Sequence, residues 1–317
     1  MRKYLIFIGI SLLCACGPRG GKTVSTPSVR DFPRAEVPAM YADMGDRIIW
    51  ASTHFWDRFT DTTRLYACDS VTVNGVTRDN VEEQMGIFVT LAEQLSVDEG
   101  GKAVARLYDR IDAFERKYPD SNVFEELCEM TRRYLYDPNS PVRDEDLYGA
   151  FVERLAGSDL IDPAYRKGYA WDARMCRLNR VGTKAADFSF TDTNGRLRTL
   201  YGIQAEYTVL IFGNPGCHAC QEIMEAMSAS PEITALIASG RIKVVDVYID
   251  EDLDDWMAHI PEYPASWING YDQDYHIRGD LLYNVRGIPS VYLLDANKTV
   301  LMKDAPQEKV LEELGRM

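Results

Sequence analysis

The chain has 317 residues and a formal net charge of −14 at pH 7, with 35 Lys and Arg against 49 Asp and Glu. Its length is sufficient for two domains of ordinary size. An acidic protein is repelled by phosphate backbones and anionic lipid surfaces, so the composition excludes nucleic acid as an expected partner.

The first residues have the pattern of an export signal, expected at 1–15. An arginine and a lysine follow the first methionine, and residues 5–13 form an apolar core that is too short to span a bilayer. The following Leu-Cys-Ala-Cys, residues 13–16, resembles the lipobox of bacterial lipoproteins, which implies cleavage before Cys16 and a lipid on that residue. An ordinary secretory signal is the alternative, because Cys14 stands where a small residue is commoner.

Residues 16–30 are rich in glycine, proline, serine and threonine, which is typical of a flexible tether. Gly17 is not the aspartate associated with retention in the inner membrane, and no acidic cluster follows Cys16 as in some surface-export signals. We therefore expect a lipid anchor in the outer membrane, with the protein facing the periplasm.

Residues 31–179 are expected to form an all-helical domain. Apolar residues recur there at spacings of three and four, the period of a helix with one buried face. The windows that show this period are 80–93, 101–118, 124–136 and 147–155. We expect about five helices in this domain.

Residues 180–317 are expected to form an α/β domain, because strand and helix patterns alternate along them. A first hairpin is expected at 186–200, with its turn at the Asp-Thr-Asn-Gly of 192–195. An apolar strand at 207–213 leads into a helical pattern at 217–229. The remaining expected elements are a helix begun by Ser230 and Pro231 and closed by Gly240, a strand at 242–249, helices at 252–260 and 272–284, a hairpin of 290–294 with 299–303, and a helix at 307–314.

The sequence Cys217-His218-Ala219-Cys220 stands where an apolar strand gives way to a helix. A thiolate is the nucleophile of disulfide exchange, and a helix N-terminus stabilises negative charge, so Cys217 is expected to be the attacking thiol. Cys220, within the first helical turn, is expected to resolve the mixed disulfide. A protonated His218 would favour the thiolate and make the oxidised form less stable.

A Cys-x-x-Cys pair has other interpretations, and its surroundings exclude them. Half of a zinc site needs two more ligands at recognisable spacing, but the remaining cysteines and histidines are scattered, so no metal is expected. A c-type haem needs histidine where Gln221 stands, and no other cofactor is indicated. Peroxiredoxins usually have threonine three residues before the cysteine, where this chain has Asn214.

Three further cysteines, Cys68, Cys128 and Cys176, belong to the expected exported body. With the active-site pair they make an odd number, so at least one cysteine stays unpaired. They are too sparse for a disulfide framework. Cys68 and Cys128 could pair if the fold brings them together, although buried free thiols are commoner.

A second motif, Gly287-Ile288-Pro289-Ser290, runs directly into an apolar strand. With the cysteine motif, the Ala-Asp-Phe of 186–188 and the Tyr-Asn-Val-Arg of 283–286, it makes residues 181–317 resemble the TlpA and ResA type of thioredoxin-like thiol-disulfide oxidoreductases. The resemblance implies that Pro289 is cis and that the backbone of Ile288 is free to pair with a substrate strand. Without the resemblance, a trans proline at the start of an edge strand would be expected.

Two departures from that family concern the active site. Gly216 precedes the first cysteine where family members typically have tryptophan. Ile223 stands where they commonly carry a glutamate that assists proton movement, and Glu222 is one place early. One place on a helix is a turn of about 100°, so Glu222 is expected to face solvent. The sequence therefore does not assign the group that moves protons to and from the thiols.

The amino-terminal part resembles a helical domain of unknown function that precedes thioredoxin-like domains in bacterial lipoproteins. The residues that carry this resemblance are Phe32-Pro33, Tyr41 and the His-Phe-Trp-Asp-Arg-Phe of 54–59. It implies no activity. His54 and Trp56 could form a binding surface, but an aromatic run on a helix more often belongs to a core.

These patterns predict a periplasmic thiol-disulfide oxidoreductase whose partners are protein thiols and disulfides. The direction of electron flow is open: His218 favours an oxidant or isomerase, and the family resemblance favours a reductant, which we prefer. The alternative is a lipid-anchored binding or scaffold protein with a redox-inactive thioredoxin fold. The substrate and the oligomeric state are not indicated by the sequence.

Overall fold

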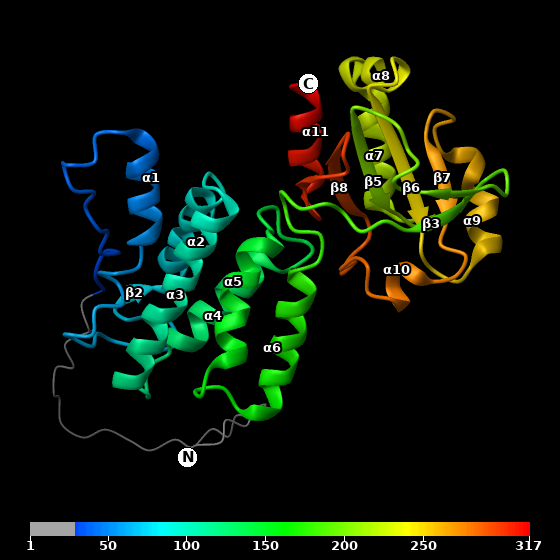
Figure 1. Cartoon of the computed structure of the whole chain (residues 1–317). Helices are drawn as coiled ribbons and strands as arrows, with labels where there is room; N and C mark the ends of the chain where they lie inside the picture. Colours follow the sequence, from blue (N-terminus) through cyan, green and yellow to red (C-terminus); the bar gives the residue numbers. More distant parts are fainter. Residues whose placement is uncertain (1–28) are drawn as a thin grey trace, which may run out of the picture.

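The computed structural model describes residues 29–317. Its amino-terminal half is helical and its carboxy-terminal half is built on a sheet (Figure 1). The expected signal segment, the lipidation site Cys16 and all but the last two residues of the expected tether lie outside the described residues. Within 29–317, no helix combines the length and the apolar character that crossing a membrane requires.

The helical half contains six helices within the described residues: α1 (Met44–Thr53), α2 (Arg78–Ala92), α3 (Val97–Lys117), α4 (Val123–Leu135), α5 (Glu145–Gly157) and α6 (Pro163–Cys176). The four periodic windows of the sequence fall on α2 to α5. The expected helical domain has one addition, a hairpin of β1 (Thr72–Val73) and β2 (Val76–Thr77). Its turn residues Asn74 and Gly75 have φ of 47° and 79°, which is why an Asn-Gly pair stands there.

Side-chain caps and a shared core explain where these helices begin and how they pack. Thr77, Ser96 and Asp144 each accept a hydrogen bond from a backbone N–H in the first turn of α2, α3 and α5, respectively.

Trp56 is 2% exposed and packs edge-on against Phe59. Its interpretation as a core residue is therefore confirmed. His54 is only partly buried, with Nδ1 2.7 Å from an Asp57 carboxylate oxygen.

The carboxy-terminal half is a mixed seven-stranded sheet in the order β4-β3-β7-β6-β5-β8-β9. The strands are β3 (Ser189–Asp192), β4 (Leu197–Thr199), β5 (Tyr207–Phe212), β6 (Ile242–Tyr248), β7 (Ile268–Tyr271), β8 (Ser290–Asp295) and β9 (Val300–Met302). β5 and β6 pair in parallel, as do β6 and β7, and the other neighbours are antiparallel. β5 is therefore an inner strand, between parallel β6 and antiparallel β8.

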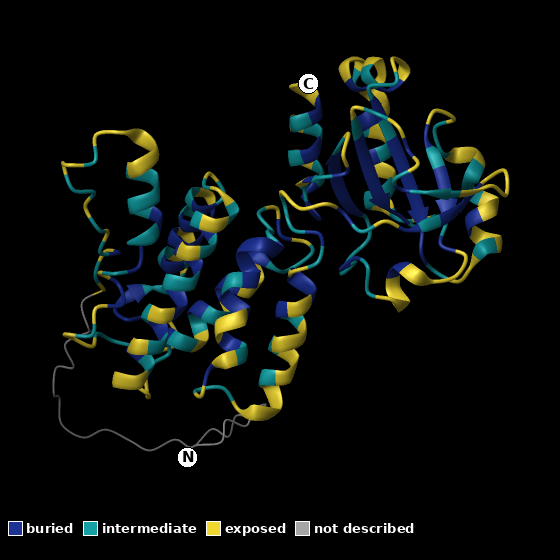
Figure 2. Cartoon of the chain, viewed as in Figure 1, coloured by how far each residue is buried: buried dark blue, intermediate teal, exposed yellow. Residues whose placement is uncertain are grey.

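Helices cover the sheet and bury its centre (Figure 2). They are α7 (His218–Ala229), α8 (Pro231–Ala238), α9 (Leu253–His259), the 3-10 helix η1 (Ile260–Glu262), α10 (His276–Gly279) and α11 (Gln307–Gly315). Val209 and Ile211 of β5 pack in the core that includes α7, α8 and α11, whereas Leu210 and Phe212 belong to the core on the opposite face. Because β5 is buried on both faces, its residues 209–212 are all apolar.

The helix expected at 272–284 is wrong for most of its length, since only His276–Gly279 is helical. Tyr275 and Leu281 bracket this turn with φ of 55° and 54°, and an α-helix cannot continue through the left-handed region. The carboxylate of Asp272 accepts the N–H groups of His276 and Ile277 and so begins a single turn. The preceding strand β7 was not expected from the sequence.

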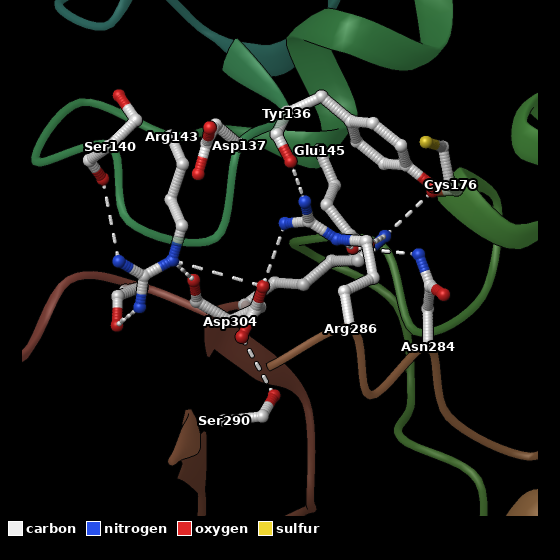
Figure 3. Close-up of polar contacts among 12 residues, drawn as sticks. Tyr136, Asp137, Ser140, Arg143, Glu145, Cys176, Asn284, Arg286, Ser290 and Asp304 are labelled. Carbon is white, nitrogen blue, oxygen red and sulfur yellow. Dashed lines mark hydrogen bonds and ion pairs between the residues drawn. The ribbon is translucent and has the colours of Figure 1, made fainter. Parts of the chain in front are cut away.

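A buried group of charges joins the two halves, and we call Glu145, Asp146, Arg286, Lys303 and Asp304 the junction cluster. Figure 3 labels Glu145, Arg286 and Asp304 of this cluster. Lys303 Nζ lies 3.1 Å from Glu145 Oε2 and 3.4 Å from Asp146 Oδ1. Arg286 Nε donates to Glu145 Oε1 at 2.5 Å, and its Nη2 donates to Asp304 Oδ2 at 2.8 Å. The first two residues start α5 in the helical half, and the other three belong to the sheet half.

The first prediction concerns the stability that this cluster provides. Lys303→Met is expected to lower the free energy of unfolding by about 3 kcal/mol, because it leaves buried carboxylates with one cation fewer. Denaturant unfolding measures the change. Lys167→Met, on the exposed surface of α6, is the control and should change stability by less than about 0.5 kcal/mol. Equal stability of the two variants would contradict a contribution from the cluster.

Candidate active site

Cys217 lies at the point where the chain leaves β5 and enters α7. It is the N-cap residue of α7, and its Sγ accepts the backbone N–H of Cys220 at 3.3 Å. The strand-to-helix position expected from the sequence is therefore confirmed. The preceding Gly216 has φ of 68°, in the left-handed region that favours glycine, so the tryptophan typical of this position would be strained here.

The second motif lies directly against the first. The Ile288–Pro289 peptide bond is cis, as the resemblance implied. Cys217 Sγ lies 3.7 Å from the Ile288 carbonyl oxygen, to which its thiol donates. The register of the sheet brings them together, because Phe212, the last residue of β5, pairs with Ser290, the first residue of β8.

Cys220, the second cysteine of the motif, is half-buried. Burial raises the pKa of Cys220, and its hydrogen bond to Cys217 and the nearby Asp246 carboxylate raise it further, against an opposing backbone contact from Asn214. Because only the thiolate attacks a disulfide, Cys220 needs a group that accepts its proton.

Asp246 is a buried carboxyl near the thiols that sequence reasoning did not single out. It lies on β6 opposite Ile211 of β5, it is 4% exposed, and burial raises its pKa to about 7. A Cβ on Gly213 would come within 2.9 Å of Asp246 Oδ2, so the glycine after β5 makes room for this carboxyl. Its one signal in the sequence is an aspartate among the apolar residues 244–249 of the expected strand. A carboxyl with a pKa near 7 is suited to exchange a proton with a neighbouring thiol.

His218 and Glu222 lie on the solvent side of α7. The His218 side chain is 86% exposed, and its Nε2 lies 3.3 Å from Glu222 Oε1. Glu222 faces solvent as expected, and Ile223 is buried in the core. Burial raises the pKa of Tyr263, and the charges of Asp246, Cys220 and Cys217 raise it further. The two thiols therefore share their buried side with one carboxyl and one phenol.

The other cysteines stand apart from this group. Cys68, Cys128 and Cys176 are free thiols, as are the two cysteines of the motif. Burial raises the pKa of Cys128 and of Cys176, which keeps both thiols protonated and unreactive. In the part of the chain that the structure describes, no three His, Cys, Asp or Glu side chains are arranged to hold a metal ion.

Comparison with known proteins agrees with this architecture. A family model described as a domain of unknown function (DUF5106) matches residues 18–177. A crystal structure of a thioredoxin-like protein from Bacteroides caccae is 31% identical, with a TM-score of 0.75, and the match covers 90% of this chain and 98% of that chain. The chain belongs to the DUF5106 family, and its carboxy-terminal half is thioredoxin-like. Both resemblances seen in the sequence are confirmed.

Other solved structures match the carboxy-terminal part alone. The C-terminal domain of an uncharacterized protein from Bacteroides fragilis is 48% identical, with a TM-score of 0.42, covering 43% of this chain and 97% of that chain. A domain of a "possible thiol-disulfide isomerase" from Cytophaga hutchinsonii is 28% identical, with a TM-score of 0.38, covering 44% and 94%. No curated protein matches the chain.

The second prediction follows from the buried carboxyl. The folded protein holds the Asp246 proton up to about pH 7, whereas an unfolded chain releases it near the ordinary value of 3.8. The folded state binds the extra proton between these values, so this group makes the protein less stable as pH rises from about 4 to about 7. Asp246→Asn should therefore be more stable than the unchanged protein at pH 8, by about 4 kcal/mol for a shift of about three units, and equally stable at pH 4.

Denaturant unfolding at pH 4, 6 and 8 measures this difference. Asp274→Asn, at an exposed aspartate of the same half, is the control and should behave like the unchanged protein at each pH. A stability difference for Asp246→Asn that does not vary with pH would show that the carboxyl is not held protonated by burial.

Proposed function

We propose that this protein is a thiol-disulfide oxidoreductase that reduces disulfide bonds of other proteins through Cys217 and Cys220. The observation that carries the proposal is the position of Cys217 Sγ, which accepts a backbone N–H at the start of α7 and faces the carbonyl of the Ile288–Pro289 cis peptide. The first contact stabilises a thiolate. The second places that thiolate beside backbone groups to which an extended substrate can bind.

The reaction has two exchanges. In the first, the Cys217 thiolate attacks one sulfur of a substrate disulfide, an S–S bond forms between them, and the other substrate sulfur leaves and takes a proton. In the second, the Cys220 thiolate attacks Cys217 Sγ, the mixed disulfide breaks and the second substrate thiol leaves. Two electrons pass from the Cys217–Cys220 dithiol to the substrate. A second dithiol, from a separate reductant, returns the pair to the reduced state.

Asp246 supplies the proton acceptor that the second exchange requires. With its pKa near 7, part of the population is ionised at neutral pH and can take the proton of Cys220. Family members commonly use a glutamate on the helix, and here that position is occupied by buried Ile223. The carboxyl comes instead from the neighbouring strand.

The proposal also includes location. A lipid on Cys16 would anchor the chain to the outer membrane with both halves facing the periplasm, and the Leu-Cys-Ala-Cys of residues 13–16 supports it. Proteins with exposed disulfides are common in that compartment, so substrates of this chemistry are available there.

The third prediction tests the chemistry. Reduction of insulin by dithiothreitol should be accelerated by the protein and not by Cys217→Ser, which lacks the attacking thiolate. Cys220→Ser should accumulate a mixed disulfide with insulin, visible on a non-reducing gel. Cys68→Ser, a half-buried thiol outside the motif, is the matched control and should retain full activity. Failure of the unchanged protein to accelerate reduction would favour a redox-inactive scaffold.

The fourth prediction concerns direction. Equilibration with a thiol redox buffer, followed by counting free thiols in the Cys217–Cys220 pair, gives its reduction potential. A reductant should have a value near the roughly −270 mV of thioredoxin. A value near the roughly −120 mV of strong periplasmic oxidants would reverse the proposed direction.

A further inference from the structure

A groove of about 480 Å³ begins at the active site and ends on the helical half. One wall contains Ala219, between the two cysteines, together with Ile288 and Pro289. The opposite wall contains Pro138, Asn139 and Pro141. These three residues belong to the segment 137–143, which links α4 to α5 in the DUF5106 domain.

The segment 137–143 is held firmly against the sheet half (Figure 3). At its end, Arg143 donates from Nε to the Asp304 carbonyl at 2.8 Å and from Nη2 to the Ala305 carbonyl at 3.0 Å. Just before its start, the Arg286 guanidinium donates to the Tyr136 carbonyl and lies 4.2 Å from the centre of the Tyr136 ring. Both ends are therefore fixed to residues near the cis peptide.

The helical half and the sheet half also come close where Pro138 faces Gly287. A Cβ on Gly287 would come within 2.9 Å of Pro138 Cβ, so the helical domain can approach this closely only because residue 287 is glycine. The backbone of Gly287 has no positive φ that would itself require glycine. Position 287 therefore requires glycine because any larger side chain there would collide with Pro138 of the DUF5106 domain.

Few charges in the groove are free to bind a ligand. Among its charged lining residues, Arg143 is bound to backbone carbonyls, and the Asp304 carboxylate accepts from Ser290 and Arg286. Glu308 is exposed and accepts from Gln307 at 3.3 Å. What remains is proline rings and uncharged polar groups, which suit the backbone of a polypeptide better than a small charged disulfide.

We propose that the segment 137–143 of the DUF5106 domain is the second wall of a polypeptide-binding groove and selects which disulfides the enzyme reduces. The occupant is an extended stretch of a substrate protein next to its reactive cysteine. The inference rests on the proposed function. When a substrate cysteine is bound to Cys217 and the substrate backbone pairs with Ile288, the substrate residues that follow lie along the groove. Its volume lies in the range of about 300–1,000 Å³ typical of ligand sites, which admits a few extended residues and no folded domain.

The fifth prediction compares two disulfides, insulin as a polypeptide and DTNB as a small molecule. Asn139→Trp places a large side chain in the groove and should lower the ratio of kcat/KM for insulin to kcat/KM for DTNB about tenfold or more, the size expected for blocking one binding contact of about 1.4 kcal/mol. Lys167→Trp, an exposed residue of α6 outside the groove, is the matched control and should leave the ratio unchanged.

A second measurement does not depend on a groove variant. In Cys220→Ser joined by a mixed disulfide to a synthetic peptide with one cysteine, backbone amides in 137–143 should exchange with deuterium more slowly than in the free protein. Two results together would overturn the groove and leave the redox function intact. The first is protection from exchange only at 217–220 and 287–290. The second is an unchanged ratio of kcat/KM for insulin to kcat/KM for DTNB in Asn139→Trp. If the unchanged protein reduces neither insulin nor DTNB, the redox function itself fails, and the groove proposal with it.

Discussion

The guanidinium of Arg286 is the group on which the arrangement of the two halves depends. It lies two residues before the cis peptide, its side chain is only 10% exposed, and it donates to Glu145, to Asp304 and to the Tyr136 carbonyl. Burial raises the pKa of Glu145, opposed by Lys303 and Arg286, so the carboxylate depends on these cations. Separating the halves would break the contacts of Arg286 with Glu145 and Tyr136, so these contacts couple the position of the DUF5106 domain to the active-site loop.

The groups of the proposed reaction are positioned by β6, β5 and β8, which are neighbouring strands of the sheet. β5 delivers Cys217 to the start of α7, antiparallel β8 begins immediately after the cis peptide, and parallel β6 places Asp246 under the turn that follows β5. In the proposed reaction Cys217 attacks, and Cys220 keeps its proton until the buried carboxyl of Asp246 accepts it. The His218 side chain is exposed and lies beside Glu222, so it takes no part in the proposed transfer between Cys220 and Asp246.

The helical domain forms one wall of the proposed substrate groove. It contributes the proline-containing segment 137–143, held against the groove by contacts that also fix the loop before Pro289. In the proposed groove, a second wall beside the active site adds contacts for chains that can lie extended between the two domains, which would give the DUF5106 domain a role in substrate choice.

The sequence alone determined the features that depend on neighbouring residues: the helical windows, the apolar strand, the cysteines at a helix start and, through a family resemblance, the cis proline. These follow from local periodicity, capping and backbone preferences. Only the tertiary structure decided which distant groups meet. Asp246 reaches the thiols because β6 happens to pair beside β5, and Glu145 meets Arg286 across 141 residues because two domains dock. A local pattern states that a residue is buried or charged, whereas strand order and docking select its partner.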